Sequence, residues 1–319
     1  MNMLYLVDHD RGEITDAALE GLTAARALDP GVAAVTVGAA GDGLAATLAE
    51  YGAAAVHQIH HDELTDYAPA AWGDAVAQLV ESTGATAVLA IGSERGNEVM
   101  AQVAAVLDLP VVVNCIEIGT GDAWEMTRVR WGGSLHERAR LEAPIKLATL
   151  ARHTTEPVTA DAPGAGTVIE FVPDLGPEAA VTRIVDRVTT EEGVTLATAP
   201  VVIAGGRGVG SEEGFAPLEE LAELLGGAVG CSRVVTNNGW RNHKFQVGQT
   251  GTVVAPEVYI GCGISGAIQH WVGMMASKNV IAINTDPDAP MVTKADYAVI
   301  GDLHEVVPAL IAEIKRRRG

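Results

Sequence analysis

The sequence predicts an α/β protein of two domains, each an open, mostly parallel sheet with helices on both faces. Three observations lead to this fold class. Short apolar runs alternate with helix-like segments in the first half, a second such series starts at Val201, and 319 residues exceed one ordinary core. We expect residues 1–190 to form an N-terminal α/β domain and residues 191–319 a C-terminal α/β domain that binds the cofactor.

The first half contains five apolar runs that predict the strands of the first sheet. These runs lie at residues 3–8, 32–38, 54–59, 87–92 and 111–118. The segments between them have the apolar spacing of amphipathic helices. The predicted helices lie at residues 16–28, 42–51, 70–81 and 96–107. Because parallel strands need such crossovers, this pattern favours βαβ units.

The pattern changes between Trp124 and Pro173, where strand-like pieces such as EMTRVRW and KLATLAR follow one another without a convincing helix. We expect antiparallel strands here, at the end of the first domain. The Thr-rich segment 181–200 predicts a connector.

The second half repeats the α/β pattern, and its strands end in small, polar or Gly-rich turns. The predicted strands lie at residues 201–208, 228–233, 257–263, 280–286 and 295–302. The predicted helices lie at residues 215–225, 265–275 and 303–317. Ligands of open parallel sheets lie at the carboxyl ends of the strands, so these turns indicate that the second half is the binding domain.

Composition excludes several classes of partner. The formal charge of −20, from 41 acids against 21 bases, disfavours a nucleic acid, which requires a basic face. No apolar run approaches the roughly 18 residues needed to span a membrane. The N-terminus lacks a basic segment and a cleavage site, so we expect a cytoplasmic protein. The three cysteines are widely separated, without a C-x-x-C pair, and we expect buried free thiols.

The stretch GCGISG, which begins at Gly261, fits the dinucleotide fingerprint G-x-G-x-x-G where a strand turns into a helix. Asp286 lies about 20 residues after Gly266, where a ribose-binding acid lies in nicotinamide-binding units. An NAD-dependent dehydrogenase that uses this loop and Asp286 is therefore one hypothesis. Against it, the loop follows the third strand of its domain, and Gln269 and His270 stand in the expected first helical turn.

Three further turns add polar groups at strand ends. GGRGVG offers backbone amides and the guanidinium of Arg207, CSR offers a hydroxyl and Arg233, and QVGQTG offers Gln249 and Thr250. Amides and guanidinium groups suit a phosphate. Four such loops in one domain indicate a common ligand site.

These segments resemble a known family when they are taken together. The combination GGRG, CSR, QVGQTG, APEVYIGCGISGAIQH, AINTDPDAP and ADYAVIGDLHEVVPAL is similar to the α subunit of electron-transfer flavoproteins, a family that includes the FixB-like proteins. The likeness runs from Val201 to the C-terminus. In the first half it is limited to the architecture and to pieces such as GSERGNEVMAQVAAVLDLP and WGGS.

The resemblance implies FAD in the second domain. The contacts that it implies are Arg207, Ser232, Arg233, Val247, Gly248, Gln249, Thr250, Ser265, Gly266, Ala267, Ile268, Gln269, His270, Asn284, Asp302 and Leu303. Arg233 is expected over the isoalloxazine ring and Thr250 beside its N5. A cationic or hydrogen-bonding His270 would stabilise the negative charge of a reduced flavin.

The resemblance also implies partners and a role. It implies a heterodimer with a β subunit, a flavoprotein dehydrogenase as electron donor, and a quinone oxidoreductase or another protein as acceptor. The chain would carry electrons and would not act as an enzyme. The sequence departs from the family pattern at Thr285 and Thr252, where lysine is common, and at Asn237, where aspartate is frequent.

Other motifs carry weaker alternatives. GSERGN, at residues 92–97, could hold a phosphate in an adenine-nucleotide sensor, and HQIHHDEL, at residues 57–64, invites a metal site. The terminal KRRR, at residues 315–318, matches the cations that close a helix. We interpret HQIHHDEL as a solvated loop.

Overall fold

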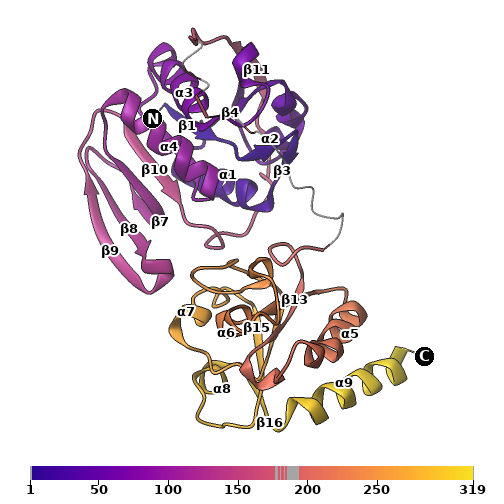
Figure 1. Cartoon of the computed structure of the whole chain (residues 1–319). Helices are drawn as coiled ribbons and strands as arrows, with labels where there is room; N and C mark the ends of the chain where they lie inside the picture. Colours follow the sequence, from indigo (N-terminus) through magenta and orange to yellow (C-terminus); the bar gives the residue numbers. More distant parts are fainter. Residues whose placement is uncertain (1, 177–178, 180, 183, 185–193, 319) are drawn as a thin grey trace. The chain divides into compact units, whose positions relative to one another are not determined.

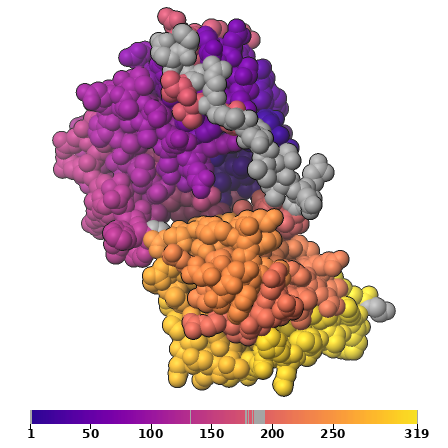
Figure 2. Space-filling view, viewed as in Figure 1, coloured from indigo at the N-terminus to yellow at the C-terminus, as the bar shows by residue number. Residues whose placement is uncertain are grey.

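The computed structural model describes residues 2–176, 179, 181–182, 184 and 194–318. Half of the connector expected over residues 181–200 lies outside the described residues. The chain divides into a first unit, Met1–Arg130 with Leu135–Val188, and a second unit, Trp131–Ser134 with Thr189–Gly319. Figure 1 shows the elements of each unit, and each unit is closely packed in the space-filling view of Figure 2.

The first unit is built on a sheet that has nine strands within the described residues, in the order β11-β5-β4-β1-β6-β10-β7-β8-β9. The strands are β1 (Met3–Leu6), β4 (Ala33–Val37), β5 (Ala55–Ile59), β6 (Ala87–Ile91), β7 (Val111–Gly119), β8 (Trp124–Arg130), β9 (Leu135–Leu141), β10 (Lys146–Leu150) and β11 (Thr167–Phe171). A separate hairpin pairs β2 (His9–Asp10) with β3 (Glu13–Ile14). The sheet is parallel from β11 to β7 and antiparallel from β7 to β9.

The expectation of antiparallel strands over residues 124–173 is wrong for two strands. β10 lies between β6 and β7 and runs parallel to both, and β11 pairs parallel with β5. The reason is visible in β10, where Leu147 and Ala148 are both fully buried and belong to opposite core clusters. A strand buried on both faces suits the centre of a parallel sheet.

Helices cover both faces of the first sheet (Figure 1). They are α1 (Asp16–Leu28), α2 (Ala45–Glu50), α3 (Pro69–Thr83) and α4 (Glu94–Leu107), with 3-10 turns η1 (Ala39–Leu44) and η2 (Asp62–Leu64). The 3-10 turn η3 (Trp131–Gly133), between β8 and β9, belongs to the second unit. Strand side chains alternate between the faces, so Leu4 packs with α3 and α4 and Tyr5 packs with α1 and α2.

Helix α1 begins where the sequence predicts, because Thr15 caps it. The Thr15 Oγ1 accepts a hydrogen bond from the Ala18 N–H at 3.2 Å, which satisfies one of the free amides of the first turn. Below this turn the Tyr5 hydroxyl donates to the Ala18 carbonyl oxygen at 2.7 Å. The phenol fits because Gly21 has no side chain there.

We expect Gly21→Ala to destabilise the first unit by about 2 kcal/mol. This is the opposite of the usual effect, in which replacing glycine by alanine inside a helix stabilises the protein. The added Cβ would collide with the Tyr5 hydroxyl and lie 2.8 Å from Cζ of the same fully buried ring. Urea unfolding of the full chain measures the loss. The double variant Tyr5→Phe, Gly21→Ala is the matched control and should recover part of it. A stabilised Gly21→Ala protein would contradict this packing.

The second unit holds a sheet of five parallel strands within the described residues, in the order β13-β12-β14-β15-β16. The strands are β12 (Val201–Gly205), β13 (Ala228–Cys231), β14 (Val258–Cys262), β15 (Asn279–Asn284) and β16 (Tyr297–Ile300). The helices are α5 (Ala216–Leu225), α6 (Arg233–Asn237), α7 (Ile268–Trp271), α8 (Pro290–Lys294) and α9 (Leu303–Arg318), with turns η4 (Arg207–Val209), η5 (Glu213–Phe215) and η6 (His243–Phe245). The predicted two α/β sheets are therefore confirmed as the fold class.

The helix predicted over residues 265–275 is wrong in length, because α7 spans Ile268–Trp271. Gly266 precedes it with a φ of +78°, a left-handed conformation that a helix cannot contain. Residues 272–276 form turns and not a continued helix. The fingerprint glycines therefore lie in an irregular loop.

Candidate functional site

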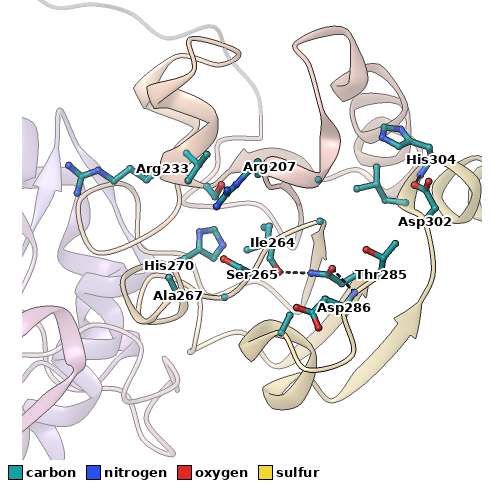
Figure 3. A pocket seen from close by; sticks show the side chains of 18 of the residues that line it. Arg207, Arg233, Ile264, Ser265, Ala267, His270, Thr285, Asp286, Asp302 and His304 are labelled. Atoms are coloured by element: carbon teal, nitrogen blue, oxygen red, sulfur yellow. Dashed lines mark hydrogen bonds between the residues drawn. The ribbon is translucent and has the colours of Figure 1, made fainter.

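A cavity of about 770 Å³ lies beyond the carboxyl ends of the strands of the second sheet. Figure 3 shows the side chains that line it. The chain crosses from one side of β12 to the other between β13 and β14, and this reversal of strand order is where open α/β sheets bind ligands. Of the predicted contacts, those in the lining are Arg207, Ser232, Arg233, Ser265, Gly266, Ala267, Gln269, His270, Asn284, Asp302 and Leu303.

The loops after β12 and β14 meet through their main chains. The Gly206 N–H donates to the Cys262 carbonyl oxygen at 2.8 Å, and the Gly208 N–H donates to the Gly263 carbonyl oxygen at 3.1 Å. A Cβ on Gly206 would lie 2.7 Å from the carbonyl carbon of Gly263. The glycines of GGRG and GCGISG therefore allow the two loops to touch, in addition to shaping each loop.

The loop after β14 presents backbone donors without acceptors. The N–H groups of Ser265, Gly266 and Ala267 donate no hydrogen bond within the described residues. The Ser265 carbonyl accepts from the Met291 N–H at 3.1 Å, which fixes this loop against α8. Three successive free amides beside a guanidinium, that of Arg207, form a site for an anion.

His270 is buried and uncharged. Burial lowers the pKa of His270 to about 4, and the nearby backbone of Val247 offsets a smaller part of this effect. The Tyr259 hydroxyl lies 2.7 Å from His270 Nε2, and burial raises the pKa of this phenol well above its usual value. The Tyr259 phenol is therefore protonated, and His270 Nε2 is its hydrogen-bond acceptor among the described residues. The phenol donates to Nε2, so the proton of the neutral imidazole is on Nδ1.

The other nitrogen of the same ring has a weak partner in the main chain. His270 Nδ1 is buried and makes no hydrogen bond of good geometry among the described residues, but the Val247 backbone interacts with the ring closely enough to offset part of the fall in its pKa. The cationic alternative considered for His270 is disfavoured by its burial, and the hydrogen-bonding alternative is retained. A buried donor with a poorly aligned partner can improve its hydrogen bonding with an acceptor from a ligand.

Asn284 joins two of the loops, and both polar atoms of its side chain already form hydrogen bonds inside the protein. Its Nδ2 donates to the Ile264 carbonyl at 2.9 Å, and its Oδ1 accepts from the Asp286 N–H at 3.1 Å. Both polar atoms of the side chain therefore have partners inside the protein. Asn284 thereby fixes the position of the cavity wall between β14 and β15.

The remaining predicted contacts lie outside the lining. They are Val247, Gly248, Gln249, Thr250 and Ile268. The loop that contains the first four packs against α7, where the Gln249 N–H donates to the Gln269 carbonyl at 2.7 Å and the Thr250 Oγ1 accepts from Gln246 at 3.0 Å. These residues support the part of the wall that contains His270.

Comparison with known proteins identifies the family. The electron transfer flavoprotein domain model matches residues 3–175, and the electron transfer flavoprotein FAD-binding domain model matches residues 195–275. The chain is 35% identical to the electron transfer flavoprotein subunit alpha of Bacillus subtilis (strain 168), over 96% of this chain and 94% of the relative. It is 36% identical to that of Mycobacterium tuberculosis (strain ATCC 25618 / H37Rv), over 99% of each. The chain belongs to the electron transfer flavoprotein alpha-subunit family.

The likeness extends to a eukaryotic relative, the probable mitochondrial electron transfer flavoprotein subunit alpha of Caenorhabditis elegans. The identity is 34%, over 98% of this chain and 93% of the relative. The resemblance stated from the sequence is therefore confirmed for both halves of the chain. Residues 195–275 form an FAD-binding domain of this family, which decides against the nicotinamide hypothesis.

The cavity fits the FAD that the electron transfer flavoprotein family binds. Its volume lies within the range of small-molecule sites, roughly 300–1,000 Å³. The free amides of residues 265–267 and Arg207 suit a pyrophosphate, and His270 Nδ1, which has no well-aligned partner among the described residues, suits a ring with acceptors. The residues present are thus compatible with the whole dinucleotide.

Sequence reasoning missed several residues of the lining. They are Gly208, Val234, Asn237, Gly263, Ile264, Thr285, Asp286, Ala289, Gly301 and His304. Asn237 and Thr285 were noted as departures from the electron transfer flavoprotein pattern, and Asp286 was assigned to the nicotinamide hypothesis. His304 directly follows the predicted contacts Asp302 and Leu303, but no pattern in the sequence singles it out.

The phosphate site suggested for GSERGN is occupied by the protein itself. The Ser93 Oγ caps α4 by accepting from the Gly96 N–H at 2.9 Å. The Arg95 guanidinium turns to Asp10, with both terminal nitrogens 3.1 Å from Oδ1, and lies 4.8 Å from the Tyr67 ring centre. These groups are engaged, so the structure gives no support to a nucleotide sensor at this turn.

The other weak candidates are also accounted for by local contacts. His60 Nε2 lies 2.7 Å from Asp42 Oδ1, and His61 Nδ1 accepts from the Glu63 N–H. Within the described residues, no group of three or more His, Cys, Asp or Glu is placed to hold a metal ion. The basic end of α9 pairs locally, as Arg316 and Arg317 do with Glu313.

Two further sequence expectations concern the cysteines and the membrane. Cys115, Cys231 and Cys262 are free and buried, as predicted. Among the described residues, no helix combines the length and apolar character required to cross a bilayer. The cytoplasmic location stays a prediction.

Proposed function

We propose that this chain carries electrons as the α subunit of a heterodimeric electron-transfer flavoprotein, with FAD in the cavity of the second unit. The observation that carries the proposal is the position of the cavity. It lies inside the segment that matches the FAD-binding domain and continues over the two strands that follow it. When bound, FAD supplies a ring that accepts and releases electrons, so no side chain has to act as a nucleophile.

The residues of the chain would bind and orient the cofactor. The free amides of residues 265–267 and the guanidinium of Arg207 would bind the pyrophosphate, since donors and positive charge converge there. The Nδ1–H of His270 would donate to an acceptor of the flavin ring. Arg233, whose side chain is exposed on the lining, would place positive charge over the ring face.

His270 would exert its effect as a neutral donor. Tyr259 is fully buried and holds Nε2, so the imidazole keeps one orientation. A neutral, fixed donor stabilises developing negative charge on a ligand without the cost of burying a second charge. The predicted contacts outside the lining would touch the flavin directly or would support the wall that contains His270. These residues are Val247, Gly248, Gln249, Thr250 and Ile268.

We further propose partners that the family resemblance suggests. A β subunit would complete the heterodimer, a flavoprotein dehydrogenase would donate electrons, and a quinone oxidoreductase or another protein would accept them. The β subunit is supported by the names of the relatives, each of which is a subunit alpha. The proposal includes no substrate bond chemistry on this chain.

We expect Arg207→Ala to weaken FAD binding at least tenfold, because a charge-assisted hydrogen bond to phosphate contributes roughly 1.5–3 kcal/mol. The side chain of Arg207 has no partner within the described residues, so its removal leaves no other group unpaired. Isothermal titration of the full-length chain, co-expressed with a β subunit, measures the affinity for FAD and for NAD.

The matched control is Arg316→Ala, an exposed arginine that pairs with Glu313 at the end of α9. This variant should bind FAD like the parent. A parent complex that binds NAD and not FAD would overturn the proposed function. An Arg207→Ala protein with unchanged FAD affinity would overturn the phosphate role of Arg207 while leaving the electron-carrier proposal in place.

A further inference from the structure

A buried glutamine joins two segments of the second unit that contain predicted FAD contacts. Gln246 is 2% exposed. Its Oε1 accepts from the Thr236 hydroxyl at 2.8 Å, and its Nε2 donates to Thr250 Oγ1 at 3.0 Å. Thr236 lies on α6, which begins at Arg233, and Thr250 lies in the loop QVGQTG. The carboxamide of Gln246 therefore connects α6 to this loop.

The main chain of Gln246 is held as closely as its side chain. Its N–H donates to the His243 carbonyl oxygen at 2.9 Å, and its carbonyl oxygen accepts from the Thr252 N–H at 2.7 Å. A Cβ on Gly251 would lie 2.8 Å from the Gln246 carbonyl carbon, so the loop folds tightly around this residue. The point from which the carboxamide extends is therefore fixed.

The direction of the hydrogen bonds leaves one hydroxyl proton available. The Thr236 hydroxyl donates toward Gln246 Oε1 and toward the Arg233 carbonyl oxygen, which lies 2.9 Å away. The amide then presents its N–H groups to Thr250, whose oxygen is the acceptor. Thr250 is exposed, and within the described residues its hydroxyl proton has no acceptor. Thr250 is thus held by its oxygen, and its proton is available to a ligand.

The loop that contains Thr250 is fixed at the edge of the cavity. Next to Thr250, the Gln249 N–H donates to the carbonyl oxygen of Gln269, a lining residue, at 2.7 Å. Gln269 directly precedes His270, and Figure 3 shows His270 at the same end of the cavity as Arg233. The Thr250 hydroxyl is therefore held beside this end.

We propose that Gln246 is a positioning residue that fixes the Thr250 hydroxyl as a hydrogen-bond donor to N5 of the flavin ring. The inference rests on the proposed function, in which the flavin ring lies toward His270. A hydroxyl without partners rotates among several staggered orientations, whereas one that accepts from a buried amide is restricted and more strongly polarised. A donor that is fixed before the ligand binds needs no reorganisation when charge develops on the ring.

A double-mutant cycle on the full-length chain, co-expressed with the β subunit, tests the proposal by titration with FAD. Gln246→Met keeps the length of the side chain without its polar atoms, and Thr236 retains the Arg233 carbonyl as acceptor. Thr250→Val removes the hydroxyl and keeps the shape. We expect each variant to weaken FAD binding about fivefold, and the double variant to lose about the same fivefold and not about 25-fold. Gln58→Met, at a buried glutamine of the first unit, is the matched control and should bind FAD like the parent.

The reduction potential of bound FAD is a second measurement, which a purely structural role of Gln246 would leave unchanged. We expect Gln246→Met to shift the equilibrium about threefold toward oxidised FAD, because a donor that stabilises charge on the reduced ring is lost. Adding Gln246→Met to Thr250→Val should shift it no further. Thr250→Ser, which keeps a hydroxyl, should retain the potential of the parent.

The possible outcomes separate this inference from the proposed function. Additive losses in the double variant would show that Gln246 acts through packing and would overturn the proposal. Unchanged FAD affinity in Thr250→Val also overturns it, and this exposed substitution stays informative if Gln246→Met folds poorly. Either result leaves FAD bound to the parent complex. A parent complex that binds no FAD would instead overturn the proposed function, and this inference with it.

Discussion

Replacing Gly266 with alanine should destabilise the second unit by about 3 kcal/mol and weaken FAD binding at least tenfold. Gly266 has a φ of +78°, which a side chain disfavours. An added Cβ would also collide with the Met291 N–H and lie 2.7 Å from its Cα, and a backbone cannot rotate away. Moving the loop would shift the amides of residues 265–267 that are proposed to hold the pyrophosphate.

The matched control separates the two effects of this substitution. Gly239 has a φ of +75° in the same unit, but its Cβ would meet nothing within 4 Å. Gly239→Ala should cost about 1 kcal/mol, the backbone penalty alone, and should bind FAD like the parent. Urea unfolding and FAD titration of both variants measure the difference. Equal losses of stability would show that the contact with Met291 is unimportant.

Acidification should destabilise the second unit through His270. The pKa of this residue is lowered from 6.5 to about 4 in the folded chain, so the unfolded chain binds a proton first as the pH falls. The unfolded state therefore holds more protons between these values, and stability declines as the pH drops below 6.5. The total decline from this one residue approaches about 3 kcal/mol near pH 4.

The pH effect is measured as a difference between proteins. His270→Gln removes the titration, so the stability of the parent should fall relative to this variant between pH 6.5 and 4 in urea unfolding without added cofactor. His243→Gln is the control, because His243 is an exposed histidine in the same unit. Burial also lowers the pKa values of His9 and His57, but these residues contribute equally to all three proteins. Parallel pH profiles for parent and His270→Gln would contradict a buried neutral imidazole.

Much of the fold could be predicted because its signals are local. Apolar runs located the strands of the second sheet and five strands of the first, β1 and β4 to β7, and the cap at Thr15 set the start of α1 at Asp16. The runs did not locate β9 or β11, whose side chains are mostly exposed. The direction of β10 depended on which strands it joined, information that its own sequence does not contain. The start of α7 depended on the left-handed conformation of Gly266, whose loop lies against Met291.

Many of the predicted contacts line one cavity because strand ends converge in a parallel sheet, as Arg207, Ser232 and Ser265 illustrate, and their contact with FAD stays a prediction. The protonation state of His270 was harder to predict, because it depends on the burial of the ring and on the hydrogen bond with Tyr259, eleven residues earlier in the chain. His304 was missed because an exposed histidine in a first helical turn has no distinctive pattern. Its place in the lining appears once α9 is positioned at the cavity.

The buried thiols bear on the chemical durability of an electron carrier. Cys231 and Cys262 end the strands β13 and β14 beside the cavity, and burial raises the pKa of each thiol to about 12. At neutral pH both stay protonated, whereas peroxides and alkylating reagents attack the thiolate. Burial and protonation therefore lower the reactivity of the two thiols beside the cavity toward oxidants and alkylating reagents.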